Sequence, residues 1–174
     1  MTGRIAQVVL VKAGPDGFPV RWVIDGGDEP ADVRARVLEG VRRPTRTVRT
    51  ELDLDDGQVV RLPFKDFAYL LPDRSGVLAI FMHGSYTHPD GSDVFPYPNN
   101  AAIFNADGSL RFQLKVVDPR VHHIDCLHGG TLPKKFEGML GVLVAYSEND
   151  MPAWAYAVNS EHPDLIDAMQ WVRY

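Results

Sequence analysis

Alternation of apolar and polar side chains recurs along the chain and predicts β-strands. In residues 109–117 single polar residues separate apolar ones, a period of two that is typical of an antiparallel sheet with one buried face. Residues 77–82 and 139–145 are apolar on both faces and predict central strands covered on both sides. We therefore expect a core that includes Leu110, Phe112, Leu114, Ile80, Leu140, Val142 and Val144.

Five turn signals that end in glycine separate these runs, at residues 14–17, 54–57, 73–76, 88–91 and 105–108. Asp or Asn can hydrogen-bond the backbone of its own turn, and glycine tolerates the positive φ that closes the reversal. Four of the five turns lie between strand-like runs. The sequence thus predicts about ten strands, mostly joined as hairpins: residues 5–11, 20–24, 47–54, 58–62, 67–71, 77–81, 101–104, 109–117, 139–146 and 153–158.

One segment has the period of an amphipathic helix. Asp28 can cap it, Pro30 is tolerated in its first turn, and Pro44 ends it. Its apolar residues share one stripe: Val33, Val37, Leu38 and Val41. The pattern also allows a shorter helix near the C-terminus, capped by Ser160, with Leu165, Ile166 and Met169 as its buried stripe. We expect an α+β, β-rich fold, an antiparallel meander or sandwich with one helix near residues 30–43 packed on a sheet.

Length and composition narrow the class of protein. The chain has 174 residues, of which 45% are hydrophobic and 24% charged, and these values fit a single globular domain over residues 1–174. Cys126 is the only cysteine, which excludes an intramolecular disulfide. The chain has neither an apolar run of 18 residues nor a recognisable targeting segment, so we expect a cytoplasmic protein that does not enter a membrane.

Charge is distributed unevenly around a net value of −5. Residues 1–50 contain nine Lys or Arg and six Asp or Glu, whereas residues 51–174 contain nine and seventeen. The basic residues of the first part form a cluster: Arg34, Arg36, Arg42, Arg43, Arg46 and Arg49. This cluster has no interleaved aromatic residues and the chain is acidic overall, which argues against nucleic-acid binding. Asp53, Asp55 and Asp56 follow the basic cluster directly. They predict either a solvated hairpin or an acidic surface that steers a basic partner.

The segment from His83 to Asn100 has no regular period but contains three prolines, three aromatic residues and two histidines. Long irregular loops in compact domains are often functional. Its aromatic residues predict either a binding surface or side chains that fold back onto the sheet: Tyr86, Phe95 and Tyr97. A third interpretation pairs His83 with Asp90 or Asp93 for acid–base chemistry.

Residues 118–128 concentrate three histidines, one cysteine and two aspartates. One hypothesis is a metal site formed by His122, His123, Asp125 and His128. Another is a catalytic set of His123, Asp125, Cys126 and His128, with Cys126 as nucleophile. Adjacent histidines point to opposite faces of a strand and no established metal motif is present, so polar packing is the alternative that we favour. Gly129, Gly130 and Thr131 with Lys134 and Lys135 could bind an anion.

The leading hypothesis is a non-catalytic protein-interaction protein without a cofactor. Bacterial immunity or antitoxin proteins, which mask a basic partner, are one such class. The expected contact residues are Asp53, Asp55, Asp56, Tyr86, Phe95 and Tyr97. The alternative is a small hydrolase-like or metal-assisted enzyme with its site around His122–His128 and the loop His83–Asn100. A third hypothesis is a closed sheet that holds a small apolar ligand.

Overall fold

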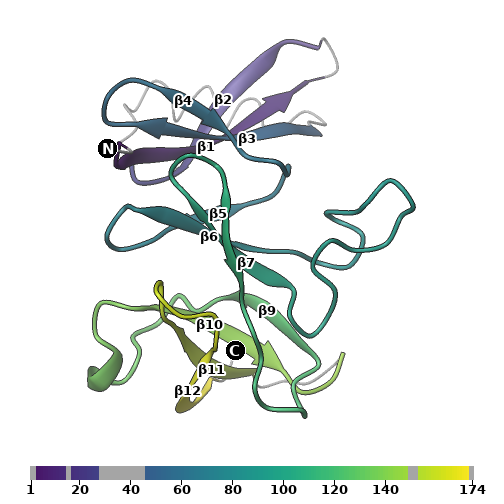
Figure 1. The fold of residues 1–174 in the computed structure, drawn as a ribbon, viewed down its shortest axis with the longest axis vertical. Helices are drawn as coiled ribbons and strands as arrows, with labels where there is room; N and C mark the ends of the chain where they lie inside the picture. Colours follow the sequence, from purple (N-terminus) through teal and green to yellow (C-terminus); the bar gives the residue numbers. More distant parts are fainter. Residues whose placement is uncertain (1–2, 15–16, 28–45, 149–152, 173–174) are drawn as a thin grey trace. The chain divides into compact units, whose positions relative to one another are not determined.

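A computed structural model of the chain shows that β-strands are the main secondary structure in the part that it describes (Figure 1). The structure describes residues 3–14, 17–27, 46–148 and 153–172. Within these ranges twelve strands and one short 3-10 helix are present, and there is no α-helix. No helix in the described ranges is long and apolar enough to cross a membrane.

Four consecutive strands form each of three four-stranded sheets. The first sheet has the order β2-β1-β3-β4, from β1 (Ile5–Ala13), β2 (Pro19–Asp25), β3 (Arg46–Leu54) and β4 (Val59–Arg61). The second has the order β5-β6-β7-β8, from β5 (Ala68–Leu70), β6 (Gly76–Ile80), β7 (Ala101–Asn105) and β8 (Leu110–Gln113). The third has the order β12-β11-β10-β9, from β9 (His123–Leu127), β10 (Leu140–Ala145), β11 (Ala153–Val158) and β12 (Ile166–Val172).

The first sheet is built around β1, which pairs antiparallel with both β2 and β3. Val9 lies opposite Val23 on one side and Glu51 on the other. The run from Val8 to Val11 is buried throughout, as expected for a central strand whose two faces are both covered. Its branched side chains suit a pleated, buried surface and therefore favour this position.

The third sheet carries a core on the face that the connection between β9 and β10 covers. The small side chains of β11 leave room there for Leu132 and for Phe136 of the 3-10 helix η1 (Lys134–Phe136). The buried members of this cluster are Leu132, Phe136, Leu143, Ala153, Ala155, Ala157 and Ala168. This packing fixes the connection against the sheet.

The chain forms two compact units. The first comprises residues 1–79 and 104–109, and the second comprises residues 80–103 and 110–174. The second unit contains the loop 81–100 and the whole third sheet, which hold most of the candidate residues. The single domain expected over residues 1–174 stays a prediction.

The α+β class is wrong for the part of the chain that the structure describes. All ten predicted strands are present, but the C-terminal segment expected to be helical contains β12, paired with β11 from Ala153–Val172 to Ala157–Ile166. A helix would bury Ile166 and Met169 together. The observed strand instead buries Ala168 and leaves the Met169 side chain 79% exposed. The predicted helix near residues 30–43 lies outside the described residues.

The predicted core is correct in its centre and wrong at one edge. Leu114, Val142 and Val144 are buried, whereas Ile80, Phe112 and Leu140 are only partly buried. Leu110 is 50% exposed. It begins β8, an edge strand of the second sheet, directly after a turn, so fewer neighbours cover it than its alternating pattern implied.

Candidate functional site

The loop between β6 and β7 is an ordered hairpin rather than an irregular segment (Figure 1). The amide of Val94 donates to the carbonyl of Tyr86, and the amide of His88 donates to that of Ser92. Its turn closes where the Gly91 amide donates to the His88 carbonyl. These bonds and the bridge between Thr87 and Asp93 close the outer part of the hairpin on itself.

Three aromatic rings form the base of this hairpin. Phe81 stacks on Phe95 with centroids 5.2 Å apart, and Tyr86 lies 5.3 Å from Phe81 and 6.1 Å from Phe95. Phe81 and Phe95 are buried and Tyr86 is half-buried. The structure thus places Phe95 in the interior, as the fold-back alternative expects, and Phe95 anchors the hairpin instead of presenting a contact surface.

The polar side of the hairpin carries two ionised carboxylates. Asp93 accepts a 2.8 Å hydrogen bond from the Gly84 amide and lies 2.5 Å from Nδ1 of His83, and these contacts lower the pKa of Asp93. Asp90 accepts bonds from the hydroxyl and amide of Ser92, which lower the pKa of Asp90. The His83 side chain is 85% exposed. Of the two partners predicted for His83, the structure selects Asp93.

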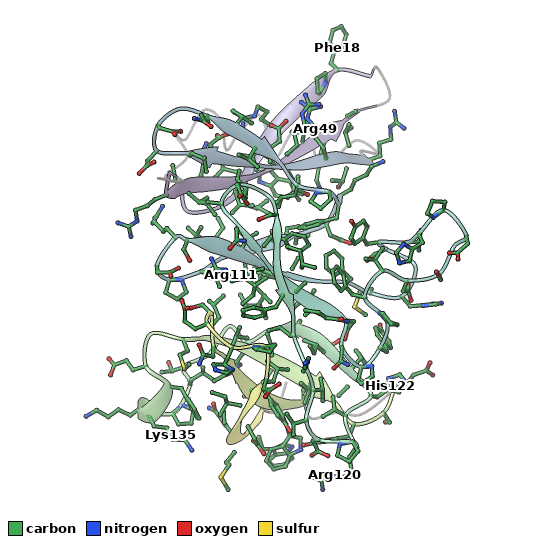
Figure 2. All side chains as sticks on the ribbon, viewed as in Figure 1. Phe18, Arg49, Arg111, Arg120, His122 and Lys135 are labelled. Atoms are coloured by element: carbon green, nitrogen blue, oxygen red, sulfur yellow. The ribbon has the colours of Figure 1, made fainter. Side chains whose placement is uncertain are left out.

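Tyr97 connects the loop to the histidines before and within β9. Its ring stacks on His123 at 4.8 Å and meets His122 edge-on at 5.6 Å, while its hydroxyl donates to the sulfur of Met82 at 3.9 Å. The Nδ1 atoms of the two histidines are 2.9 Å apart. The expectation that these histidines point to opposite faces is wrong, because His122 precedes β9 and does not follow its alternation. The His122 side chain is labelled in Figure 2.

Asn100 joins the loop to β9 and was not identified from the sequence. Its amide donates to the carbonyls of Phe81 and Ile124 at 2.9 and 2.8 Å, and its Oδ1 accepts from the Ile124 amide at 2.8 Å. The side chain is fully buried. Asn100 therefore pairs with the backbone of Ile124 as a neighbouring strand would, and it fixes the start of β9.

The metal set predicted from the sequence does not come together among the described residues, and the catalytic set of His123, Asp125, Cys126 and His128 stays a prediction. His123 Nε2 lies 3.6 Å from Asp125 Oδ1, but Cys126 packs against the core cluster of the third sheet and His128 lies beyond the end of β9. Among the described residues no three His, Cys, Asp or Glu side chains could hold a metal ion together. The structure groups His122 and His123 with Tyr97 instead.

The acidic residues predicted for partner binding lie in the first unit. Asp53 accepts hydrogen bonds from Arg21 at 2.5 Å and from Gln7 at 2.7 Å, so its charge is already paired. Asp55 and Asp56 are exposed in the turn between β3 and β4. Their carboxylates also accept bonds from backbone amides. Only these last two present carboxylates that solvent reaches freely.

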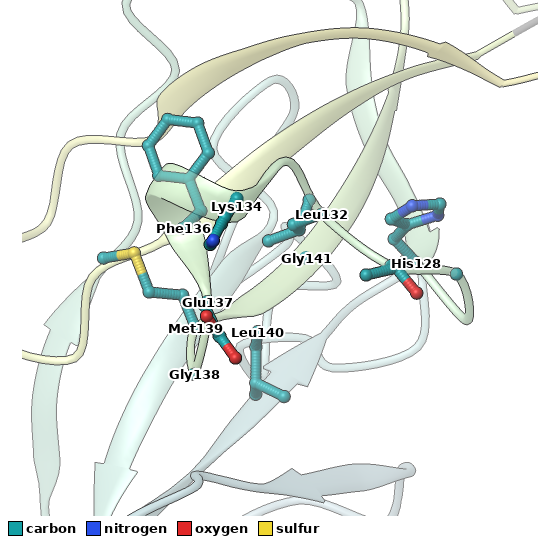
Figure 3. A pocket seen from close by; sticks show the side chains of 11 residues that line it. His128, Leu132, Lys134, Phe136, Glu137, Gly138, Met139, Leu140 and Gly141 are labelled. Carbon is teal, nitrogen blue, oxygen red and sulfur yellow. The ribbon is translucent and has the colours of Figure 1, made fainter.

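A cleft of about 580 Å³ opens beside the connection between β9 and β10 (Figure 3). Its walls include the apolar side chains of Leu132, Phe136, Met139 and Leu140. Its polar lining residues are His128, Thr131, Lys134 and Glu137. The sequence signal for this region was the glycine-rich run with two lysines, which suggested an anion site and did not reveal the apolar wall.

The second unit thus has three candidate features. They are an acidic hairpin, a cluster of Tyr97 with His122 and His123, and a cleft with apolar and polar walls. The hairpin and the cluster meet at Tyr97, whereas the cleft lies past the opposite end of β9. Comparison with protein-family models, curated proteins and solved structures found no match to this chain.

Proposed function

We propose that the protein is a non-catalytic interaction protein and that the hairpin at residues 82–99 binds a basic protein partner. The observation that carries this proposal is the preorganisation of the hairpin. Backbone hydrogen bonds close its outer part, and buried Phe81 and Phe95 anchor its base. A loop that is already ordered loses little conformational entropy on binding, which favours affinity.

Charge indicates the kind of partner. Asp90 and Asp93 are ionised well below neutral pH because hydrogen bonds stabilise their carboxylates. Asp93 is paired with His83 and is only 12% exposed, so exposed Asp90 is the carboxylate that a partner would meet. Both belong to a chain with net charge −5. Opposite charge on a partner would speed encounter by electrostatic steering. We favour one form of this function, in which the protein masks a basic partner as an immunity or antitoxin protein does. We place this interaction in the cytoplasm.

The contact surface proposed here differs from the one expected from the sequence. Tyr97 and half-buried Tyr86 remain candidates at the hairpin, but Phe95 serves as its internal anchor. Asp53 is paired with Arg21 and is not part of the surface. Asp55 and Asp56 are kept as a second, separate acidic contact in the first unit.

The chain supplies a matched control for the test. Asp90 and Asp107 both occupy Asp-Gly-Ser turns, and each accepts bonds from the amide and hydroxyl of the serine two residues on. Asp90→Asn and Asp107→Asn each remove one charge and keep an acceptor. They should therefore perturb folding equally, and only Asp90→Asn should perturb binding.

The full chain is used as bait in a lysate of its source cells, and association with the captured protein is then measured. We expect a basic protein whose association rate falls about threefold or more with Asp90→Asn, or on raising salt, and stays unchanged with Asp107→Asn. Failure to capture a basic protein, or equal effects of both variants, would reject the proposal.

One observation favours the enzyme alternative, the convergence of Tyr97, His122 and His123. His122 could act as a base whose orientation His123 fixes. Hydrolysis of p-nitrophenyl acetate tests this directly, with exposed His162→Ala as the control for His122→Ala. Loss of turnover in His122→Ala alone would support an enzyme, and equal background rates in both variants would exclude this chemistry.

A further inference from the structure

The cleft beside η1 has a wall that belongs to the core of the third sheet. Leu132 and Phe136 line it and are also buried members of that core cluster, against which Met139 packs (Figure 3). The apolar side of the cleft is therefore fixed by packing and does not depend on a mobile surface side chain. Its volume, about 580 Å³, lies within the range of small-molecule sites.

The His128 ring packs closely against two glycines. A Cβ at Gly130 would lie 2.8 Å from Cε1 and 3.1 Å from Nε2 of the ring. A Cβ at Gly141 would lie 3.0 Å from the Cβ of His128 and 3.0 Å from Cδ2 of Leu132. The backbone amide of His128 also donates to the Gly141 carbonyl at 2.8 Å. Only residues without side chains leave room for the imidazole here.

Nε2 of His128 is buried and has no hydrogen-bond partner among the described residues. Within the same ranges the one other such atom is Oε1 of Gln170, whose amide donates to the carbonyl of Thr131, a residue that lines the cleft. Leaving a buried polar atom unpaired costs free energy, and such atoms in folded proteins call for a cause. A ligand that pairs with Nε2 supplies one.

The charges at the cleft indicate a neutral ligand. One cation, Lys134, and one anion, Glu137, line it, so neither sign is favoured. The ammonium of Lys135 lies 4.7 Å from the centre of the Phe136 ring. A hydroxyl group suits Nε2 in either tautomer, because it can donate a hydrogen bond or accept one.

We propose that this cleft binds a small neutral molecule with an apolar body and a hydroxyl group. The apolar body packs against Leu132, Phe136 and Met139, and the hydroxyl hydrogen-bonds to Nε2 of His128 as the segment at Gly130 moves aside. This site is separate from the hairpin proposed to bind a protein partner and does not depend on that function. It replaces the anion site suggested by the sequence, which becomes an outcome of the test.

Benzyl alcohol is the probe, added to the full ¹⁵N-labelled chain and followed by amide chemical shifts. We expect saturable shifts confined to residues 128–141, with a dissociation constant on the order of 1 mM, as for a ligand of this size. Toluene, benzoate and benzylamine should bind at least about threefold more weakly, since each lacks the neutral hydroxyl. Absence of saturation with benzyl alcohol, or tighter binding of benzoate, would overturn the proposal.

Adjacent glycines give the matched variants. Gly130→Ala places a methyl group against the His128 ring and should abolish saturation, whereas a Cβ at Gly129 meets no atom within 4 Å and Gly129→Ala should bind normally. His128→Leu replaces the imidazole by an apolar side chain of similar size. Benzyl alcohol and toluene should then bind with equal dissociation constants. If Gly130→Ala fails to fold, the His128→Leu result alone decides. A retained preference for the alcohol in His128→Leu contradicts the proposal.

Discussion

Buried polar groups at the two ends of β9 differ in whether they have hydrogen-bond partners. At its start, Asn100 pairs with both backbone groups of Ile124, and buried His123 has His122 as a partner 2.9 Å away. Just past its other end, Nε2 of His128 has no partner among the described residues. Satisfied groups of the first kind specify a fold, whereas an unpaired group beside a cleft indicates a place where something else binds.

The difference comes from what the neighbouring segments can offer. The loop 81–100 brings Asn100 and Tyr97 against the start of β9. Past the other end, the covering segment is Gly129–Gly130, which has no side-chain donors or acceptors. The variants below test whether the first end is structural and the second is open to a ligand.

The largest effect is expected for Asn100→Ala. It leaves the Ile124 amide and the carbonyls of Phe81 and Ile124 without their buried partner. Each such group costs roughly 1–3 kcal/mol, so we expect the free energy of unfolding to fall by about 3–5 kcal/mol in urea denaturation. Gln113→Ala, which loses a single part-buried bond to the Asn99 carbonyl, is the control and should cost under about 1.5 kcal/mol. Equal losses of unfolding free energy in Asn100→Ala and Gln113→Ala would show that Asn100 has no special structural role.

A fully paired charge in the first sheet provides a reference. Glu51 is 4% exposed and lies 3.2 Å from Nε of Arg21, 2.5 Å from Nε of Arg49 and 3.8 Å from Nε of Arg61. Glu51→Gln should lower the free energy of unfolding by about 1–2 kcal/mol, below the usual cost for a buried pair because solvent reaches the arginines. Arg61→Gln should cost less than about 0.5 kcal/mol. Equal costs in thermal or urea unfolding would show that the network is not centred on Glu51.

The same contrast explains how far the sequence could predict the fold. Hairpins such as that around Gly108 were predictable because the turn signal and both strands lie within a few residues. β9 was not, because in His123–Leu127 only Ile124 and Cys126 alternate with polar residues, and its His, Asp and Cys also suit a functional loop. It becomes a strand through pairing with β10, as at Leu143 opposite Cys126, and through Asn100. β12 likewise depends on its partner β11.

Candidate residues were harder to predict than strands. The concentration of chemistry in residues 118–128 was visible, but which side chains meet was set by Tyr97 and by the position of His122 outside the strand. The cleft depends on close approaches to His128 at two glycines, eleven residues apart in the chain. No local pattern encodes such a contact, whereas the exposed carboxylates of Asp55 and Asp56 could be inferred from one turn.

A smaller effect of opposite sign is expected at the second end of β9. His128→Leu removes an unpaired buried nitrogen and retains apolar bulk. Its free energy of unfolding should stay the same or rise by up to about 1 kcal/mol, since replacing an unsatisfied group by an apolar one relieves its desolvation penalty. Urea denaturation checks this beside Asn100→Ala. A loss above about 2 kcal/mol would mean that Nε2 has a structural partner, and the contrast between the two ends would fail.

The smallest effect should be a dependence on acid at Asp118, on the segment that leads into β9. Its carboxylate accepts bonds from the Arg120 guanidinium at 2.7 and 3.0 Å and from the Arg120 amide at 2.9 Å. These bonds lower the pKa of Asp118 from 3.8 to about 2. A depressed pKa means that the native state holds the ionised form more tightly than the unfolded state does. The stabilisation is therefore complete above about pH 4 and is lost as the pH falls toward 2.

Asp118→Asn should therefore lower the unfolding midpoint slightly at pH 6 and by less as the pH falls toward 2, where about half of the native Asp118 carboxylates are protonated. The effect is small because solvent screens this exposed pair. Thermal unfolding of both proteins across this pH range measures it, with exposed Asp164→Asn as a control that should run parallel to the wild type. If the wild-type and Asp118→Asn curves stay parallel down to pH 2, the Asp118–Arg120 pair does not stabilise the approach to β9. The order at that end would then rest on Asn100, on the stacking of Tyr97 and on the pairing with β10.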